Sequence, residues 1–275
     1  MNYHVRLRVL LTALILAAGV PARAAPSEVA LVTDVAGMAE LGAASPRRTL
    51  ALLAVLRTDD TLRLADGARV VVAYPAAGPV FELKGPGVYR VAEQGIVATS
   101  GAMNRSELAA PLRALKIDPK RAVQASLVMR GVDGRALTAA APVGRQLEAH
   151  ARTLKWQPTL TVPETNWSYD VALVDDDGKV VFRATTRDSG ITLPADLQLR
   201  RNEPYVWTVT AEGRYGRRAE AAAEFTLVDS NVERLLLGAQ AAAAESRSNE
   251  AVYLLALRQH GLAQAAEIWA KRLRP

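Results

Sequence analysis

The chain has 275 residues, no cysteine and a formal net charge of +6, and its basic residues alternate with acidic ones. A chain without cysteine has no disulfides, cysteine nucleophiles, thiolate metal sites or lipidated N-terminal cysteine. No basic run is interleaved with aromatic residues, so we expect no nucleic-acid partner.

Residues 1–24 have the organisation of a secretory signal peptide. Arginines precede residues 9–19 (VLLTALILAAG), an apolar run too short to span a membrane, and Ala22 and Ala24 occupy the positions that a signal peptidase reads. We expect cleavage between Ala24 and Ala25, which removes three arginines and leaves a charge of +3. No later apolar stretch reaches membrane length, so we predict a soluble bacterial periplasmic protein without a transmembrane segment.

Residues 25–103 are predicted to form an antiparallel β domain. Short runs of strand-forming residues are separated by turn signals such as Asp66-Gly67 and Gly85-Pro86-Gly87. Residues 49–56 (TLALLAVL) fit a buried strand or a helical segment, because so short an apolar run does not separate the two.

Two segments of this domain carry a family resemblance. Residues 56–72 (LRTDDTLRLADGARVVV) and 81–91 (FELKGPGVYRV) resemble the periplasmic domain of ferric-citrate regulators, the FecR-like family. The pattern is an acidic turn, a polar strand, Asp-Gly and an apolar strand, followed by a further β meander. The resemblance implies an exported, non-catalytic β domain that contacts other proteins or the envelope.

Residues 104–134 are predicted to be a connector that packs against one neighbour. Pro111 makes any helix in this region short or interrupted. Residues 122–129 fit one additional strand.

Residues 135–228 are predicted to form a two-sheet sandwich, because apolar and polar residues alternate in at least four strands separated by turns. Tyr205, with Leu199 upstream, and Trp156 in an early strand resemble the tyrosine corner and core tryptophan of fibronectin type III and immunoglobulin-like domains. The resemblance implies a spacer or binding module.

Within this sandwich, Asp175, Asp176 and Asp177 precede Gly178. One interpretation is a calcium site, because calcium binds several carboxylate oxygens. The acids are consecutive, however, and Asp-Gly between alternating runs is typical of a hairpin turn, which we favour. No zinc motif or nucleotide-binding loop occurs, so we expect no cofactor and no metal.

Residues 229–275 are predicted to be an α-helical tail. Ser230 and Glu233 have the spacing of a capping box, and two further helices follow as an antiparallel hairpin. Residues 253–261 (YLLALRQHG) with Trp269 resemble one tetratricopeptide-like hairpin. That resemblance implies a tail that caps the sandwich or docks on a partner.

Other candidate groups receive structural interpretations. His260 precedes Gly261 at a helix end, where the helix dipole favours an imidazolium ion, and His150 has no nucleophile nearby in the sequence. The aromatic residues could form a platform that binds sugars, but we favour a role in the hydrophobic core. These residues are Tyr74, Tyr89, Trp167 and Tyr169.

We predict a mainly β fold: an N-terminal β-meander domain and an immunoglobulin-like sandwich, with a short C-terminal α-helical hairpin. The predicted function is that of an exported, non-catalytic scaffold or sensor-accessory module that binds another envelope protein. A module for cell-wall or polysaccharide glycan and a carboxylate-based hydrolase remain as alternatives. The candidate partner surfaces are an exposed apolar helical patch and a basic turn, formed by Leu254, Leu257 and Trp269 and by Arg214, Arg217 and Arg218.

Overall fold

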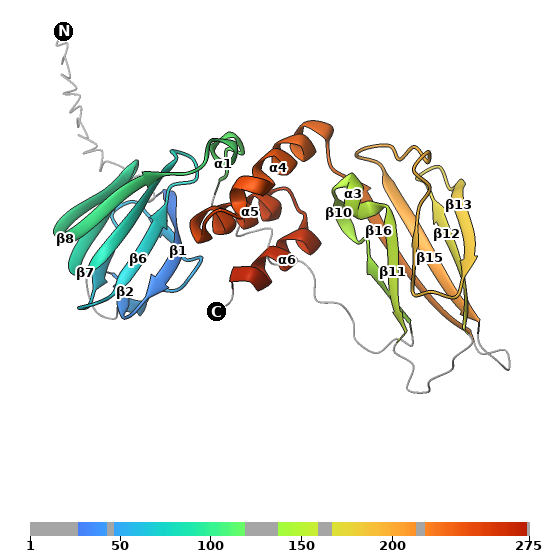
Figure 1. Cartoon of the computed structure of the whole chain (residues 1–275), viewed down its shortest axis with the longest axis horizontal. Helices are drawn as coiled ribbons and strands as arrows, with labels where there is room; N and C mark the ends of the chain where they lie inside the picture. The colour runs from blue at the N-terminus through green and yellow to red at the C-terminus, as the bar shows by residue number, and fades with distance from the viewer. Residues whose placement is uncertain (1–26, 43–46, 119–136, 159–166, 213–217, 274–275) are drawn as a thin grey trace, which may run out of the picture.

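The structure is a computed structural model that describes residues 27–42, 47–118, 137–158, 167–212 and 218–273. It is mainly β with short C-terminal helices, which confirms the predicted fold class. A curled N-terminal sheet and a β sandwich lie at opposite ends of the molecule, and helices α4 (Ser230–Ala243), α5 (Arg247–Gln259) and α6 (Ala263–Leu273) lie between them (Figure 1). In these ranges no helix combines the length and the apolar character required to cross a membrane.

The N-terminal sheet is antiparallel and curls into a half-barrel. Its strand order is β3-β2-β5-β7-β6-β1-β4, and β8 pairs with β7 outside this path. The ambiguous residues 49–56 contribute strand ends and a turn rather than a helix. The strands are β1 (Glu28–Ala36), β2 (Ala39–Leu41), β3 (Arg48–Thr49), β4 (Val55–Arg57), β5 (Thr61–Leu64), β6 (Arg69–Ala73), β7 (Pro79–Ala92) and β8 (Gly95–Glu107).

The long β7–β8 hairpin bends near its middle. Residues 85–87 of β7 form an irregularity in the pairing, opposite Gly101 of β8, whose φ is +96°. The hydroxyl of Tyr89 lies at this bend, 2.5 Å from the carbonyl oxygen of Lys84 and 2.8 Å from that of Ala102. A Cβ atom at Gly101 would lie 2.3 Å from the Tyr89 hydroxyl oxygen, so this position requires glycine.

The region after this sheet differs in part from the predicted connector. β8 continues to Glu107, past the expected boundary at residue 103. The short helix α1 (Ala110–Ala114) carries a proline in its first turn, as expected from Pro111. Residues 122–129, the additional strand predicted from sequence, lie outside the described residues.

The second β unit is a sandwich of a five-stranded sheet, β10-β16-β15-β12-β13, and a three-stranded sheet, β14-β11-β9. Trp156, Trp207 and Phe225 are buried between the sheets. Tyr205 is also buried, and its hydroxyl accepts a hydrogen bond from the backbone N–H of Arg200 at 2.7 Å, as expected for a tyrosine corner. The elements are β9 (Leu137–Ala141), β10 (Gly144–Gln146), α3 (Glu148–Ala151), β11 (Thr153–Pro158), β12 (Ser168–Val174), β13 (Val180–Thr186), β14 (Gly190–Thr192), β15 (Pro204–Glu212) and β16 (Arg218–Leu227).

The aspartate cluster of the sandwich forms the predicted hairpin turn. The backbone N–H of Gly178 donates to the carbonyl oxygen of Asp175 at 3.1 Å, and strands β12 and β13 flank the turn. The guanidinium of Arg200 lies 3.3–3.4 Å from carboxylate oxygens of Asp175, Asp176 and Asp177. The positive group beside these three carboxylates is therefore an arginine side chain of the same sandwich.

The C-terminal helices are α4 (Ser230–Ala243), α5 (Arg247–Gln259) and α6 (Ala263–Leu273). α5 contacts β1 and β6 of the N-terminal sheet as well as α1, α4 and α6. Residues 251–257 of α5 are all buried, because neighbours surround this helix on several sides. The hydroxyls of Ser248 and Thr33 lie 2.9 Å apart at the start of α5.

This packing corrects the prediction of an exposed apolar patch on the tail. The exposed fractions of Leu254, Leu257 and Trp269 are 0%, 1% and 7%. All three belong to one core cluster that also contains Leu31 of β1 and Leu112 of α1. The apolar face predicted from sequence is therefore covered by other parts of the same chain, which include the N-terminal sheet, α1 and the neighbouring helices.

Candidate binding groove

The start of α4 differs from the predicted capping box. Asp229 is the N-cap residue, and its carboxylate accepts a hydrogen bond from the backbone N–H of Asn231 at 2.8 Å. Ser230 is the first helical residue, and Glu233 does not reach back to it. Instead, the Glu233 carboxylate accepts a hydrogen bond from the backbone N–H of Glu148 at 2.7 Å. The glutamate thus links α4 to the sandwich.

Arg201 completes this link with two ion pairs. Its guanidinium lies 2.5 Å from the Glu233 carboxylate and 2.7 Å from the Glu148 carboxylate, and it donates to the carbonyl oxygen of Val228 at 2.9 Å. The guanidinium of Arg152 forms an ion pair with the other carboxylate oxygen of Glu148 at 2.8 Å. Glu233 is only 6% exposed, so its charge needs these partners to remain stable out of water.

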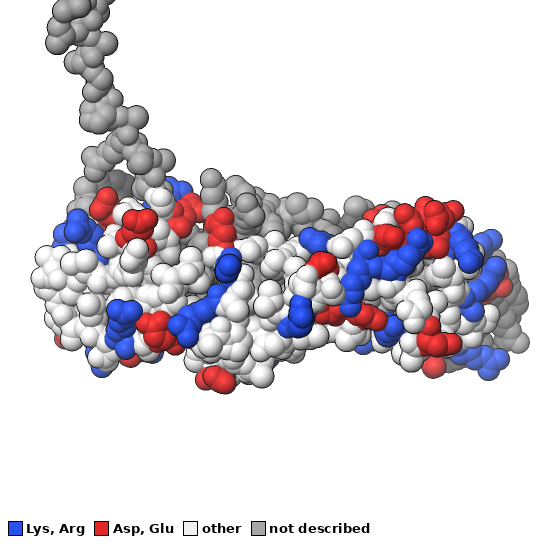
Figure 2. Space-filling view, turned by 90° about the horizontal axis from the view of Figure 1, so that it is seen from above, with Lys and Arg blue, Asp and Glu red and all other residues white. Residues whose placement is uncertain are grey.

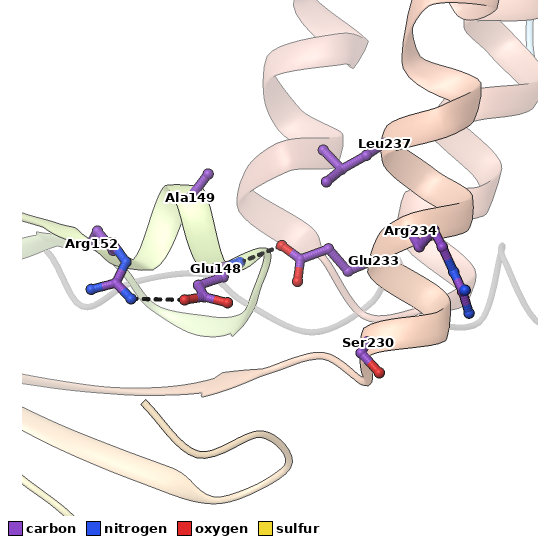
Figure 3. Close-up of a pocket in the computed structure, with 7 residues that line it drawn as sticks. All are labelled: Glu148, Ala149, Arg152, Ser230, Glu233, Arg234 and Leu237. Atoms are coloured by element: carbon purple, nitrogen blue, oxygen red, sulfur yellow. Dashed lines mark hydrogen bonds and ion pairs between the residues drawn. The ribbon is translucent and has the colours of Figure 1, made fainter. Parts of the chain in front are cut away.

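An open groove of about 640 Å³ lies above this network, between α3 and α4. Figure 3 shows Leu237 extending from α4 toward α3, where Ala149 lies, while Glu148 and Glu233 meet below them. Arg234 points away from α3 on the other side of the helix (Figure 3), and its guanidinium contacts the side-chain oxygen of Asn231. The groove is lined by Glu148, Ala149, Arg152, Ser230, Glu233, Arg234 and Leu237.

The groove combines an apolar wall with a polar floor. Leu237 is 46% exposed, although it faces another secondary-structure element across the groove. The carboxylates of Glu148 and Glu233 are bound by arginine side chains and by a backbone N–H. An apolar side chain placed against Leu237 and Ala149 would bury hydrocarbon without removing the partners of these charges. This arrangement suits binding by shape and apolar contact.

The helices meet the sandwich at a second place. The side-chain oxygen of Gln264 in α6 accepts hydrogen bonds from the backbone N–H of Val143 at 3.1 Å and the side chain of Gln146 at 2.8 Å. Its amide donates to the carbonyl oxygen of Ala140 at 2.7 Å. A smaller groove of about 410 Å³ beside this contact includes His150 in its lining. α4 and α6 therefore contact the sandwich at separate points.

The other predicted surface is described in part. Arg218 is exposed at the first position of β16, opposite Glu212 of β15. Arg214 and Arg217 lie outside the described residues. The role of this basic turn stays a prediction.

The histidine expected to favour its charged form has the opposite tendency. His260 is partly buried at the end of α5, and this burial lowers the pKa of its imidazole; the nearby charge of Arg145 lowers that pKa further. The neutral imidazole is therefore favoured, and the prediction of a stabilised imidazolium ion is wrong.

The aromatic residues support the core interpretation. Tyr74 and Tyr89 are buried in the N-terminal sheet, and Tyr169 is buried in the sandwich. Trp167 is partly buried against the sandwich core. Among the described residues, no group of three or more histidine, aspartate or glutamate side chains is arranged to hold a metal ion.

Comparison with known proteins gives little further guidance. No protein-family model matches the chain, and no curated protein matches it. Among solved structures, the crystal structure of CopC from Methylosinus trichosporium OB3b is similar with 17% sequence identity and a TM-score of 0.25. The match covers 32% of this chain and 85% of the CopC chain. A TM-score this low supports no argument about fold or function.

Sequence reasoning missed Glu148, Arg152 and Arg201, and it assigned Glu233 to a helix cap. Arg201 and Glu148 are 53 residues apart in the chain, and the Glu233–Glu148 pair spans 85 residues. No local pattern brings such residues together. The apolar run at 251–257 (AVYLLAL) did carry a usable signal, because a helix that is apolar on all sides is typically buried on all sides.

Proposed function

We propose that this protein is an exported, non-catalytic scaffold that binds another protein of the bacterial envelope at the groove between α3 and α4. The observation that carries the proposal is the placement of the C-terminal helices between the two β units. α5 packs on β1 and β6, and α4 is bound to the sandwich through Glu233 and Arg201. A partner that binds at this junction would meet a preformed surface, which lowers the entropic cost of binding.

The chemistry of the groove selects a class of partner. Leu237 and Ala149 offer an apolar wall, while the charges below them already have partners. An apolar side chain such as leucine, methionine or phenylalanine fits the wall of Leu237 and Ala149 better than a charged one, because a charge placed there would lose water while Glu148, Glu233 and Arg152 already have counterions. We therefore propose that the partner inserts an apolar side chain from a loop or helix.

Export is the second part of the proposal. It is supported by the signal-peptide pattern of residues 1–24, which lie outside the described residues. The FecR-like pattern of residues 56–72 and 81–91 supports the same compartment. Fractionation of the host cell would test it directly, with a mature N-terminus at Ala25 as the expected result.

Site-specific photocrosslinking tests the groove. A photoreactive amino acid replaces Leu237 in one variant and Leu235 in a control variant, and each is expressed in the native host. The two leucines are 46% and 44% exposed on the same helix, but only Leu237 lines the groove. We expect a discrete ultraviolet-dependent adduct with Leu237 and none with Leu235.

A loss-of-contact experiment completes the test. Leu237→Asp should remove the interaction with the crosslinked protein in a binding assay with purified components, whereas Leu235→Asp should leave it intact. Adducts of equal yield at both positions, or none at either, would contradict a binding role for the groove. Retention of the purified protein on peptidoglycan, unaffected by Leu237→Asp, would instead favour the glycan-binding alternative.

A further inference from the structure

The outer edge of β8 lacks a partner among the described strands. β8 pairs with β7 along its length, and the strand order places no described strand on its other side. In an antiparallel pair, each strand bonds to its neighbour through alternate residues, so the other backbone N–H and C=O groups of β8 point toward the free edge. Residues 99–107 are all exposed.

Most of this edge lacks the charged residues and prolines that often protect an edge strand. Residues 95–104 (GIVATSGAMN) contain no charged residue and no proline, which are common protective devices. Val97 and Met103 are 46% and 40% exposed. Arg105 and Glu107, near the end of the strand, form an ion pair with each other at 3.0 Å. In Figure 2 the extreme left of the molecule, the end where β7 and β8 lie in Figure 1, is largely white, with charged side chains above and below it.

The bend in β8 restricts what can pair with it. Gly101, with its φ of +96°, lies at the middle of the strand, and the irregularity of β7 lies directly opposite. A straight strand can follow only one half of a bent edge. A second β8, related by a two-fold axis that stands beside Gly101 and normal to the sheet, has its own irregularity directly opposite the first, so the regular half of each strand lies against the other half of its partner. This geometry is isologous, the usual arrangement in homodimers.

The side chains are compatible with such self-pairing. Ala98 lies opposite Tyr89 and Met103 lies opposite Leu83, and both of these β7 residues are buried. Ala98 and Met103 therefore share the inner face of the hairpin. An antiparallel second β8 that places its Met103 beside Ala98 keeps the inner faces of both copies on one side. Because the charged residues lie at one end of each strand, no like charges meet across the axis.

We infer that two copies of this chain associate through antiparallel pairing of their β8 strands, which joins the two N-terminal sheets into one. The inference does not depend on the proposed binding groove, which lies at the other end of the helices. A single strand pair buries less surface than a typical stable interface of about 1,600 Å². We therefore expect a dissociation constant on the order of 10–100 μM.

Sedimentation equilibrium of the purified protein tests the association. We expect the weight-average mass to rise toward twice that of the monomer over this concentration range. Met103→Lys should weaken dimerisation at least tenfold, because it places two charges at the paired edges. Val180→Lys is the matched control, since Val180 is 52% exposed on β13, the edge strand of the sandwich. Circular dichroism verifies that both variants are folded.

Cysteine crosslinking tests the register, because the native chain contains no cysteine. Ala98→Cys and Met103→Cys proteins, mixed under oxidising conditions, should give a mixed disulfide dimer in far higher yield than either protein alone. A protein that remains monomeric at 100 μM overturns the inference. So does equal weakening by the Met103→Lys and Val180→Lys variants, the absence of a mixed disulfide, or the capture of a different protein on the edge of a monomeric chain.

Discussion

Replacement of Glu233 by alanine should destabilise the junction between α4 and the sandwich. The change removes the ion pair with Arg201 at 2.5 Å and the acceptor for the Glu148 backbone N–H at 2.7 Å. A hydrogen bond that involves a charged group contributes about 1.5–3 kcal/mol. Arg201 keeps Glu148 and the Val228 carbonyl oxygen as partners, so the loss stays below the sum of the two interactions. We expect the free energy of unfolding to fall by about 3 kcal/mol.

Urea denaturation measures this loss. With a denaturant slope of about 2–3 kcal/mol per molar, the midpoint should fall by about 1–1.5 M. Replacing Trp269 by phenylalanine in every protein of the series confines the fluorescence signal to the sandwich, which contains the other three tryptophans, Trp156, Trp167 and Trp207. The tryptophan fluorescence then follows the unfolding of the sandwich, and the shift of its midpoint measures how much the contact with the helices stabilises the sandwich.

Two comparison variants separate the junction from a generic charge effect. Glu40→Ala removes a more exposed ion pair, with Arg47 at 3.2 Å, and should cost at most about 1 kcal/mol. Glu233→Gln keeps an oxygen that can accept from the Glu148 N–H, and should cost about half as much as the alanine variant. If Glu233→Ala costs no more than Glu40→Ala, the network does not hold the sandwich to the helices.

Three further measurements address other parts of the structure. Tyr205→Phe removes the acceptor of the tyrosine-corner hydrogen bond and should cost about 1–2 kcal/mol in urea denaturation; no loss would contradict a stabilising role for this bond. Leu254→Ala should lower the free energy of unfolding by about 2–5 kcal/mol because its side chain is fully buried. Leu235→Ala, at a 44% exposed position of α4, should change it by less than about 0.5 kcal/mol. Losses of similar size in the two variants would refute the helix packing. Burial and the charge of Arg145 lower the pKa of His260 in the folded protein, so the unfolded chain takes up this proton at a higher pH than the folded chain does. Stability should therefore decrease as the pH falls through and below about 6.5, the pKa of the unfolded chain. Thermal melts of a His260→Gln variant should lose this part of the pH dependence, and an unchanged pH profile would refute the argument.

The strands and helices were largely predictable because their signals are local. Alternation over Tyr169, Val171 and Leu173 places these side chains on one buried face, as the structure has them. The hairpin at Asp175 followed from turn chemistry and is confirmed. Each of these predictions depends on neighbours within a few residues, which a sequence displays directly.

The location of the helices was not predictable from the same kind of pattern. An apolar helix face indicates burial but does not identify the covering surface. Ser248 meets Thr33 across 215 residues of chain, and Glu233 found a partner in Glu148 instead of in its own helix. The groove depends on these long-range contacts, so its residues lay beyond local reasoning. The apolar face at Leu254 was identified correctly, but the surface that covers it belongs to the same chain and not to a partner protein.

The position of α5 also has a consequence for the order in which the chain can fold during synthesis. Leu31 of β1 and Val80 of β7 share a core with residues of α5 that are made more than 150 positions later. Until α5 has been made, this side of the first sheet has only part of its native cover, from α1 and the residues beside it, and the rest must stay exposed to water or be shielded by another protein. A chain interrupted anywhere before residue 247 would therefore display an apolar surface, a feature by which proteases and chaperones distinguish incomplete products from finished ones.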